Sequence, residues 1–163
     1  LVAGIGGLAG TLVGGWLSDR MSNKTGDKRW YIWVPFISTV AAIPFALNTF
    51  LIMGSGMAAT FSWFIPVFFG GLYLAPCIAM THGLVGLRMR AMGSAVLFFV
   101  LNLIGLGLGP WLTGIMSDLL TLQFGDFALR YAMSVTVMVN VWCAFHYYKA
   151  SKTIREDLSR APE

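Results

Sequence analysis

Long apolar stretches alternate with short polar loops along almost the whole chain. Four windows, approximately residues 30–52, 59–81, 92–116 and 128–147, are each long enough to form a spanning helix, and residues 1–17 form a fifth, slightly shorter one. A helix needs roughly 20 mainly apolar residues to cross about 30 Å of hydrocarbon. The pattern therefore predicts an all-α integral membrane protein with about five transmembrane helices in residues 1–149, followed by a polar C-terminal tail over 150–163.

The loops between these windows carry a strongly biased charge. Ten of the 11 Lys and Arg residues fall in alternate loops and in the tail, and Arg130 is the exception. Short loops rich in Lys and Arg stay on the cytoplasmic side of a membrane. The ten residues are Arg20, Lys24, Lys28, Arg29, Arg88, Arg90, Lys149, Lys152, Arg155 and Arg160. This bias predicts that the hairpin at 18–29, the loop at 86–92 and the C-terminus are cytoplasmic.

Composition agrees with a membrane protein. Hydrophobic residues make up 57% of the 163 residues and charged residues only 11%, whereas soluble domains carry about 25% charged residues. The net charge of +4 does not indicate nucleic-acid binding, because the basic residues lie in short loops between apolar windows and not on one folded face. Cys77 and Cys143 both lie within apolar windows and are interpreted as small core residues.

Glycine and proline mark particular places in the windows. Gly6, Gly10 and Gly14 recur every four residues, a spacing that brings small residues onto one helix face and allows close helix packing in a membrane. Pro66 and Pro76 interrupt one window, and the Gly-Ser-Gly sequence at 54–56 predicts a tight turn before it. Gly105, Gly109 and Pro110 predict a helix that can kink, because proline removes a backbone hydrogen bond.

Two polar side chains stand out by their positions. Asp19 ends the first window, where its carboxylate can face the positive N-terminus of a neighbouring helix, so we expect it to hold one conformational state closed. Asn102 is the most polar residue deep in its window, so we expect either a substrate contact or a bond to another helix. No Asp, Glu, Lys or Arg lies near the centre of a window, so the sequence shows no evident proton or ion carrier.

Two motifs carry a resemblance to a known family. The sequence Gly15-x-Leu17-Ser18-Asp19-Arg20, followed by Gly26 and Lys28-Arg29, resembles the signature loop of the major facilitator superfamily, although the spacing before Gly26 is enlarged and Asp27 is inserted. Residues 88–110, from Arg-Met-Arg-Ala-Met-Gly-Ser-Ala to Gly-Leu-Gly-Pro, resemble the eleventh helix of the bacterial spinster-like branch.

The resemblance implies a fold and a set of site residues. The chain would be a fragment comprising helices eight to twelve, the C-terminal helical bundle of the superfamily fold, with roughly the first seven helices missing. It implies a cytoplasmic latch and an interface helix that includes Gly105, Gly109 and Pro110. The latch residues are Gly15, Asp19, Arg20, Gly26, Lys28 and Arg29. The tenth helix would line a central cavity with Trp63, Phe69, Tyr73 and Cys77, and Asn102 is a further candidate.

These observations predict a function in transport. We expect alternating access for a small organic or amphiphilic solute, in an integral protein of the bacterial inner membrane that needs its N-terminal helical half. The alternatives are an organic-anion or organic-cation symporter of the same superfamily and a non-transporting membrane scaffold. The sequence has no Cys/His cluster at metal spacing, no paired carboxylates outside loops and no phosphate-binding loop, so we expect no enzyme activity, metal or cofactor.

Overall fold

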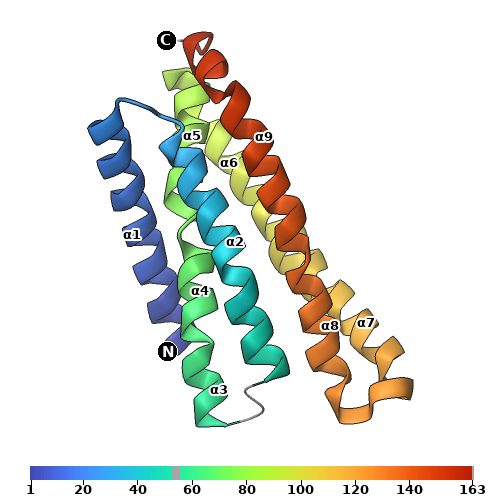
Figure 1. The fold of residues 1–163 in the computed structure, drawn as a ribbon. Coiled ribbons are helices and arrows are strands. Elements are labelled where there is room, and N and C mark those ends of the chain that lie inside the picture. Colours follow the sequence, from blue (N-terminus) through green and yellow to red (C-terminus); the bar gives the residue numbers. More distant parts are fainter. Residues whose placement is uncertain (53–55, 163) are drawn as a thin grey trace.

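The computed structural model describes residues 1–52 and 56–162, and the described residues are almost entirely helical, with none in a strand. Residues 54 and 55 of the expected turn lie outside this description. Successive passes of the chain run alternately up and down the molecule, and some of them comprise several consecutive helical segments (Figure 1). They are α1 (Val2–Thr25), α2 (Trp30–Leu51), α3 (Met57–Ser62), α4 (Phe64–Gly71), α5 (Leu74–Leu84), η1 (Leu87–Met89), α6 (Arg90–Val100), η2 (Leu101–Leu108), α7 (Gly109–Phe124), η3 (Gly125–Phe127), α8 (Ala128–Val137) and α9 (Val139–Ser159).

Three of the described helical stretches are long and apolar enough to cross a membrane, judged by length and composition: Trp30–Leu51, Met57–Leu84 and Leu87–Ser159. The third reverses direction at η3, so it contains two of the expected windows (Figure 1). α1 is not one of the three. Its last third carries Asp19, Arg20 and Lys24, which lower its hydropathy, and its crossing of the membrane stays a prediction.

The backbone of α1 lies directly against that of α4. Gly6, Gly10 and Gly14 are buried along one side of α1, and a Cβ added at Gly10 or Gly14 would overlap the carbonyl oxygen of Phe68 or Leu72. The approach is reciprocal, because a Cβ added at Gly71 of α4 would lie 2.6 Å from the Gly7 carbonyl oxygen. The prediction that the glycine spacing serves close helix packing is confirmed.

Three prolines lie near the starts of helices α4, α5 and α7. Pro66 lies in the first turn of α4 and Pro76 in the first turn of α5, where a missing N–H costs little because no carbonyl of the same helix would have accepted it. Pro110 likewise lies in the first turn of α7, directly after the π-helical segment η2. The predicted interruptions at Pro66 and Pro76 are therefore present, and Pro110 lies where the π-helical segment changes to an α-helix, within a continuous helical stretch. Pro35 and Pro44, by contrast, lie inside α2, which continues through both.

The last helix extends beyond the end of its apolar window. Although we expected a tail to begin at residue 150, α9 continues to Ser159. Ile154 of this extension is buried with Ile32 of α2 and Met80 of α5, and Leu158 packs against the same cluster. The spacing of four residues between Ile154 and Leu158 places both on one face, so burial of these apolar side chains holds the extension against the bundle.

The packing of α1 generates a direct test. Replacing Gly14 by Ala should force α1 and α4 apart, because the new Cβ would overlap the Leu72 carbonyl oxygen, and should lower the free energy of unfolding by about 1–3 kcal/mol. Gly4→Ala is the matched control, since a Cβ there meets nothing within 4 Å. Unfolding in mixed detergent micelles measures the free energy of unfolding of Gly14→Ala and Gly4→Ala. Equal stability of the two variants would contradict the packing described here.

Candidate functional site at the basic end of the bundle

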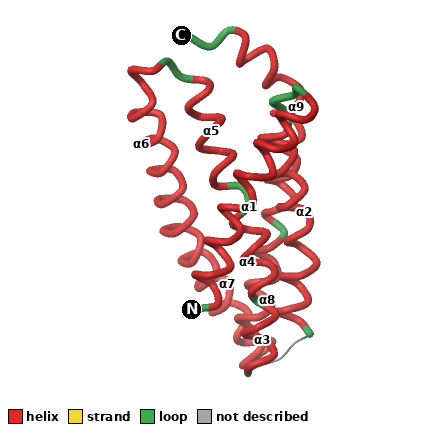
Figure 2. Tube along the Cα trace, turned by 90° about the vertical axis from the view of Figure 1, so that its left-hand side faces the viewer, coloured by secondary structure: helices red, strands yellow, loops and turns green. Residues whose placement is uncertain are grey.

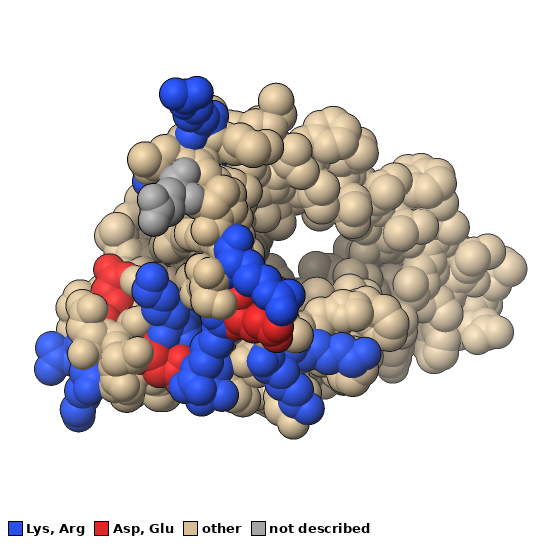
Figure 3. All heavy atoms as spheres, turned by 90° about the horizontal axis from the view of Figure 1, so that it is seen from above, with Lys and Arg blue, Asp and Glu red and all other residues tan. Residues whose placement is uncertain are grey.

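The basic loops meet at one end of the molecule. The α1–α2 connection, the α5–α6 connection and the end of α9 all lie at the upper end of Figure 1. Figure 3 looks down on this end and shows Lys and Arg side chains gathered on one part of it, with acidic side chains among them and a large uncharged area beside a hollow. The predicted latch residues belong to the second half of α1 and to the α1–α2 connection that reaches this end.

The turn between α1 and α2 depends on Gly26. α1 ends there with φ at 69°, and the Gly26 N–H donates to the Ser22 carbonyl oxygen at 2.8 Å. A left-handed backbone at this position is the usual helix C-cap and strongly favours glycine. The chain can therefore reverse over residues 26–29, which brings the end of α1 beside the start of α2.

Asp19 lies opposite the first turn of α2, as its place at the end of the first window predicts. Its partner, however, is a side chain: the Tyr31 hydroxyl donates to Asp19 Oδ1 at 2.6 Å. A hydrogen bond to a carboxylate is shorter and about twice as strong as one between neutral groups. The contact therefore ties α1 to α2 by a bond that is lost if the two helix ends separate.

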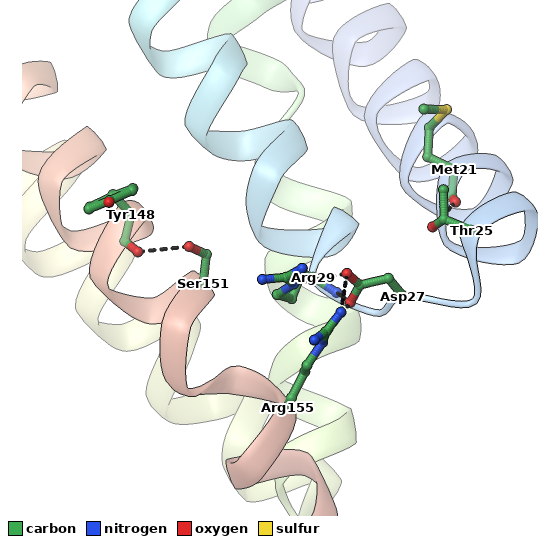
Figure 4. A network of polar contacts seen from close by, with 7 residues as sticks. All are labelled: Met21, Thr25, Asp27, Arg29, Tyr148, Ser151 and Arg155. Atoms are coloured by element: carbon green, nitrogen blue, oxygen red, sulfur yellow. Dashed lines mark hydrogen bonds and ion pairs between the residues drawn. The ribbon is translucent and has the colours of Figure 1, made fainter.

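The densest polar contact centres on Asp27, which was interpreted from the sequence only as an insertion. The Arg29 backbone N–H donates to Asp27 Oδ1 at 3.0 Å, and Arg29 Nε donates to Oδ2 at 2.9 Å. Arg155 of α9 donates to the same carboxylate through Nη2 at 2.7 Å and Nε at 3.3 Å (Figure 4). One carboxylate thus joins the α1–α2 turn to the C-terminal extension of α9.

The electrostatics of Asp27 follow from these donors. The hydrogen bond from Arg155 is the largest cause, and with those from Arg29 it holds the pKa of the Asp27 carboxyl well below its ordinary value of 3.8. Hydrogen bonds and positive charge both favour the ionised form. Asp27 therefore stays negative, and keeps its partners, across the neutral and mildly acidic range.

The other predicted latch residues have different surroundings. The Arg20 guanidinium lies over the Trp16 ring, 5.3 Å from its centroid, an arrangement that adds a modest cation–π attraction. Gly15 faces α5, and a Cβ added there would lie 3.2 Å from the Ala75 Cβ. Of the predicted basic residues, Arg29 is therefore the one that joins the Asp27 cluster, which we define as Asp27, Arg29 and Arg155.

The predicted cavity-lining residues do not come together in one place. Trp63 lies against Phe50 with ring centroids 5.1 Å apart, whereas Phe69 stacks on Phe45 at 5.6 Å. Cys77 Sγ lies 3.5 Å from the Tyr147 hydroxyl, on the side of α5 that faces α9. Their common role in a central cavity stays a prediction.

Asn102 has a local partner in the structure. Its Nδ2 donates to the Phe98 carbonyl oxygen of the same helix at 2.7 Å. This bond lies at the start of η2, and the Phe98 carbonyl oxygen also accepts from the Leu101 backbone N–H. The substrate contact or bond to another helix that we expect for Asn102 stays a prediction.

Sequence reasoning missed Asp27 and Arg155 for different reasons. Asp directly after a Gly C-cap and before a new helix is a recognisable N-terminal pattern, so Asp27 could have been found. Arg155 could not, because only the packing of the α9 extension places residue 155 beside residue 27.

No model of a known protein family matches the chain. The chain is, however, 31% identical over 159 residues to a protein of Mycolicibacterium smegmatis described as an MFS-type efflux pump. The match covers 97% of this chain and 36% of the relative, so the chain spans about a third of that protein's length. This similarity supports membership of the major facilitator superfamily. With the apolar helices, it supports an integral membrane protein.

The Asp27 cluster makes a quantitative prediction. Asp27→Asn and Arg155→Gln should each lower stability, and a double-mutant cycle should give a coupling of about 0.5–1 kcal/mol, the range for partly exposed ion pairs. The coupling should be equal at pH 5 and pH 7, because the Asp27 pKa lies below its ordinary value of 3.8. Arg160→Gln, which removes the pair with Glu156 seen among the described residues, should show no coupling to Asp27. Zero coupling between Asp27 and Arg155 would contradict the cluster.

Proposed function

We propose that this chain forms one helical wall of a major facilitator transporter that moves a small organic or amphiphilic solute by alternating access. The observation that carries the proposal is the similarity over 97% of the chain to a protein described as an MFS-type efflux pump. The arrangement of the basic end supports it, because the residues of the signature-like loop there make contacts between helices. Within the superfamily, the spinster-like branch is the assignment that the motif at 88–110 favours.

The proposal gives the basic end a role in the transport cycle. On this proposal, the loops at that end and the C-terminus are cytoplasmic, in the bacterial inner membrane. The Asp19–Tyr31 bond and the Asp27 cluster would then hold the cytoplasmic ends of α1, α2 and α9 as one body. A rocking motion needs bundles that stay rigid while they move against each other.

The exposed side chains indicate where a second bundle would pack. Ile5, Leu8, Leu12 and Trp16 lie at spacings of three or four residues along α1, and each side chain is more than half exposed. Residues spaced in this way share one helix face. The proposed partner is the N-terminal helical half of the same transporter, with lipid covering the remaining apolar surface.

A transport assay tests the proposed function. Cells expressing the full gene are loaded with ethidium, N-phenylnaphthylamine or carboxyfluorescein, and the loss of each dye is followed with and without a proton gradient. Asp19→Asn should lower the rate for the transported dye roughly tenfold, since hydrogen bonds to charged groups contribute about 1.5–3 kcal/mol. Tyr31→Phe should do the same by removing the donor, and Pro110→Ala should lower the rate by restoring a regular helix.

The controls separate transport from folding. Asp118→Asn changes an exposed carboxylate on α7 and should leave the rate unchanged. All variants should reach the membrane at the wild-type level. Wild-type rates in Asp19→Asn and Pro110→Ala would contradict the mechanism. A wild-type protein that transports none of a broad solute panel, yet captures a membrane partner, would favour the scaffold alternative.

A further inference from the structure

Two lysines of α9 each lie over an aromatic ring of the same helix. Lys149 Nζ lies 4.6 Å from the centroid of the Phe145 ring, and Lys152 Nζ lies 4.4 Å from the centroid of the Tyr148 ring. Each ring is four residues before its lysine, so both lysine side chains lean back towards the apolar part of the helix. A lysine at the polar end of a spanning helix usually extends the other way, towards water. The two ammonium groups are therefore held at the depth of the rings.

The rings beneath the lysines are positioned by contacts within the chain. Tyr148 lies 6.4 Å from both Trp33 and Phe36 of α2, measured between ring centroids, and Trp33 meets Phe36 edge to face at 5.4 Å. Phe145 lies 6.2 Å from Trp142. α9 packs along α2, and Figure 2 shows α6 on the opposite side of the molecule from both. The place of the two ammonium groups thus follows from helix packing and does not depend on an empty space.

The positive charge of this pair is not balanced by acidic side chains. Lys149 and Lys152 are three residues apart, a spacing that makes them neighbours on one helix face and lets like charges repel. The ion pairs among the described residues join Asp27 and Glu156 to arginines, and none includes either lysine. Each ammonium has three N–H donors, and a ring covers only one side of it. Two adjacent cations in this arrangement favour an anion that accepts hydrogen bonds from both.

The depth of the pair indicates which anion fits. Trp and Tyr rings at the end of an apolar helix lie at the level of the lipid headgroups, where the phosphate of a phospholipid is the anionic group. Anionic lipids attract basic residues at this level. A protein surface without an acid would instead remove water from two ammonium groups uncompensated, which is costly. A phospholipid headgroup with a net negative charge therefore matches the pair best.

We infer that Lys149 and Lys152 bind the headgroup of one anionic phospholipid at the α2–α9 surface. The phosphate oxygens accept hydrogen bonds from both ammonium groups, and the rings of Phe145 and Tyr148 hold these groups at headgroup depth. This goes beyond the proposed transport function, because the lipid is bound at equilibrium and is not the transported solute.

Native mass spectrometry of the full-length protein tests the inference. The protein is titrated in detergent with dioleoylphosphatidylglycerol, or with dioleoylphosphatidylcholine, which has the same acyl chains and no net charge. The anionic lipid should bind at least fivefold more tightly. The double variant Lys149→Gln/Lys152→Gln should weaken its binding roughly twentyfold, since each basic residue near an anionic surface contributes about a factor of five. Binding of phosphatidylcholine should not change.

A second double variant controls for net charge. Arg88→Gln/Arg90→Gln also removes two positive charges, but these residues belong to η1 and to the start of α6, away from the α2–α9 surface (Figure 2). It should bind phosphatidylglycerol as the wild type does. An equal loss of affinity in the two double variants, or wild-type affinity in Lys149→Gln/Lys152→Gln, would remove the lysine pair as the site.

Substitutions of Tyr148 test the role of the ring. Tyr148→Leu removes the ring below Lys152 and should weaken binding of phosphatidylglycerol about threefold, the effect of a cation–π contact at an exposed site. Tyr148→Phe keeps the ring and should bind as the wild type does. Wild-type affinity in Tyr148→Leu would overturn the part of the inference that assigns a positioning role to the ring.

Thermal unfolding separates a lipid from a protein partner. In nanodiscs of phosphatidylcholine alone, Lys149→Gln/Lys152→Gln should melt within about 3 °C of the wild type. A larger loss there would identify an acidic side chain elsewhere in the full-length protein as the partner, because breaking a buried ion pair is strongly destabilising, and would overturn the inference. Equal affinity for the two lipids would overturn the anionic class. Failure of the dye-transport assay would leave these results intact, because they require no gradient and no turnover.

Discussion

The contact between the backbones of α1 and α4 determines how the rest of the bundle is arranged. Within a membrane, lipid tails are as apolar as leucine, so helices associate mainly through close packing and polar contacts. Gly10 and Gly14 permit that packing because any Cβ there would overlap α4. The same stripe continues to Ser18, which is fully buried and whose Oγ lacks a hydrogen-bond partner among the described residues. Packing is thus favoured over hydrogen bonding along this face.

The position of α1 has consequences at its end. Once α1 is fixed against α4, the left-handed Gly26 turn directs the chain into α2, and Asp19 comes within reach of Tyr31. The turn also presents Asp27 towards α9, where burial of Ile154 has already set the position of Arg155. The contact between Asp27 and Arg155 therefore depends both on the local turn at Gly26 and on the apolar packing of the α9 extension.

The sequence predicted the parts of this arrangement that depend on local chemistry. Glycine spacing in α1 and the prolines at 66, 76 and 110 act through their own backbone, so their effects follow from the sequence. The extent of α9 did not follow, because Ile154 and Leu158 follow a basic segment and become core residues only when α2 and α5 are present. The hydrogen bond of Asn102 did not follow either, because its acceptor is the Phe98 carbonyl oxygen of the same helix; the expected substrate contact or bond to another helix stays a prediction.

Glycine has two opposite physical roles in the two halves of the chain, and the spacing alone does not distinguish them. In α1 it removes side chains so that another backbone can fill the space, which makes the helix pair rigid. In η2 and α7, Gly105 and Gly114 make no close approach to another described backbone, and their role lies in the backbone of their own helix. A π-helical segment followed by a proline supports this second role, because that backbone has fewer regular hydrogen bonds to lose when it bends. The same residue type therefore permits close packing in α1 and bending in η2 and α7.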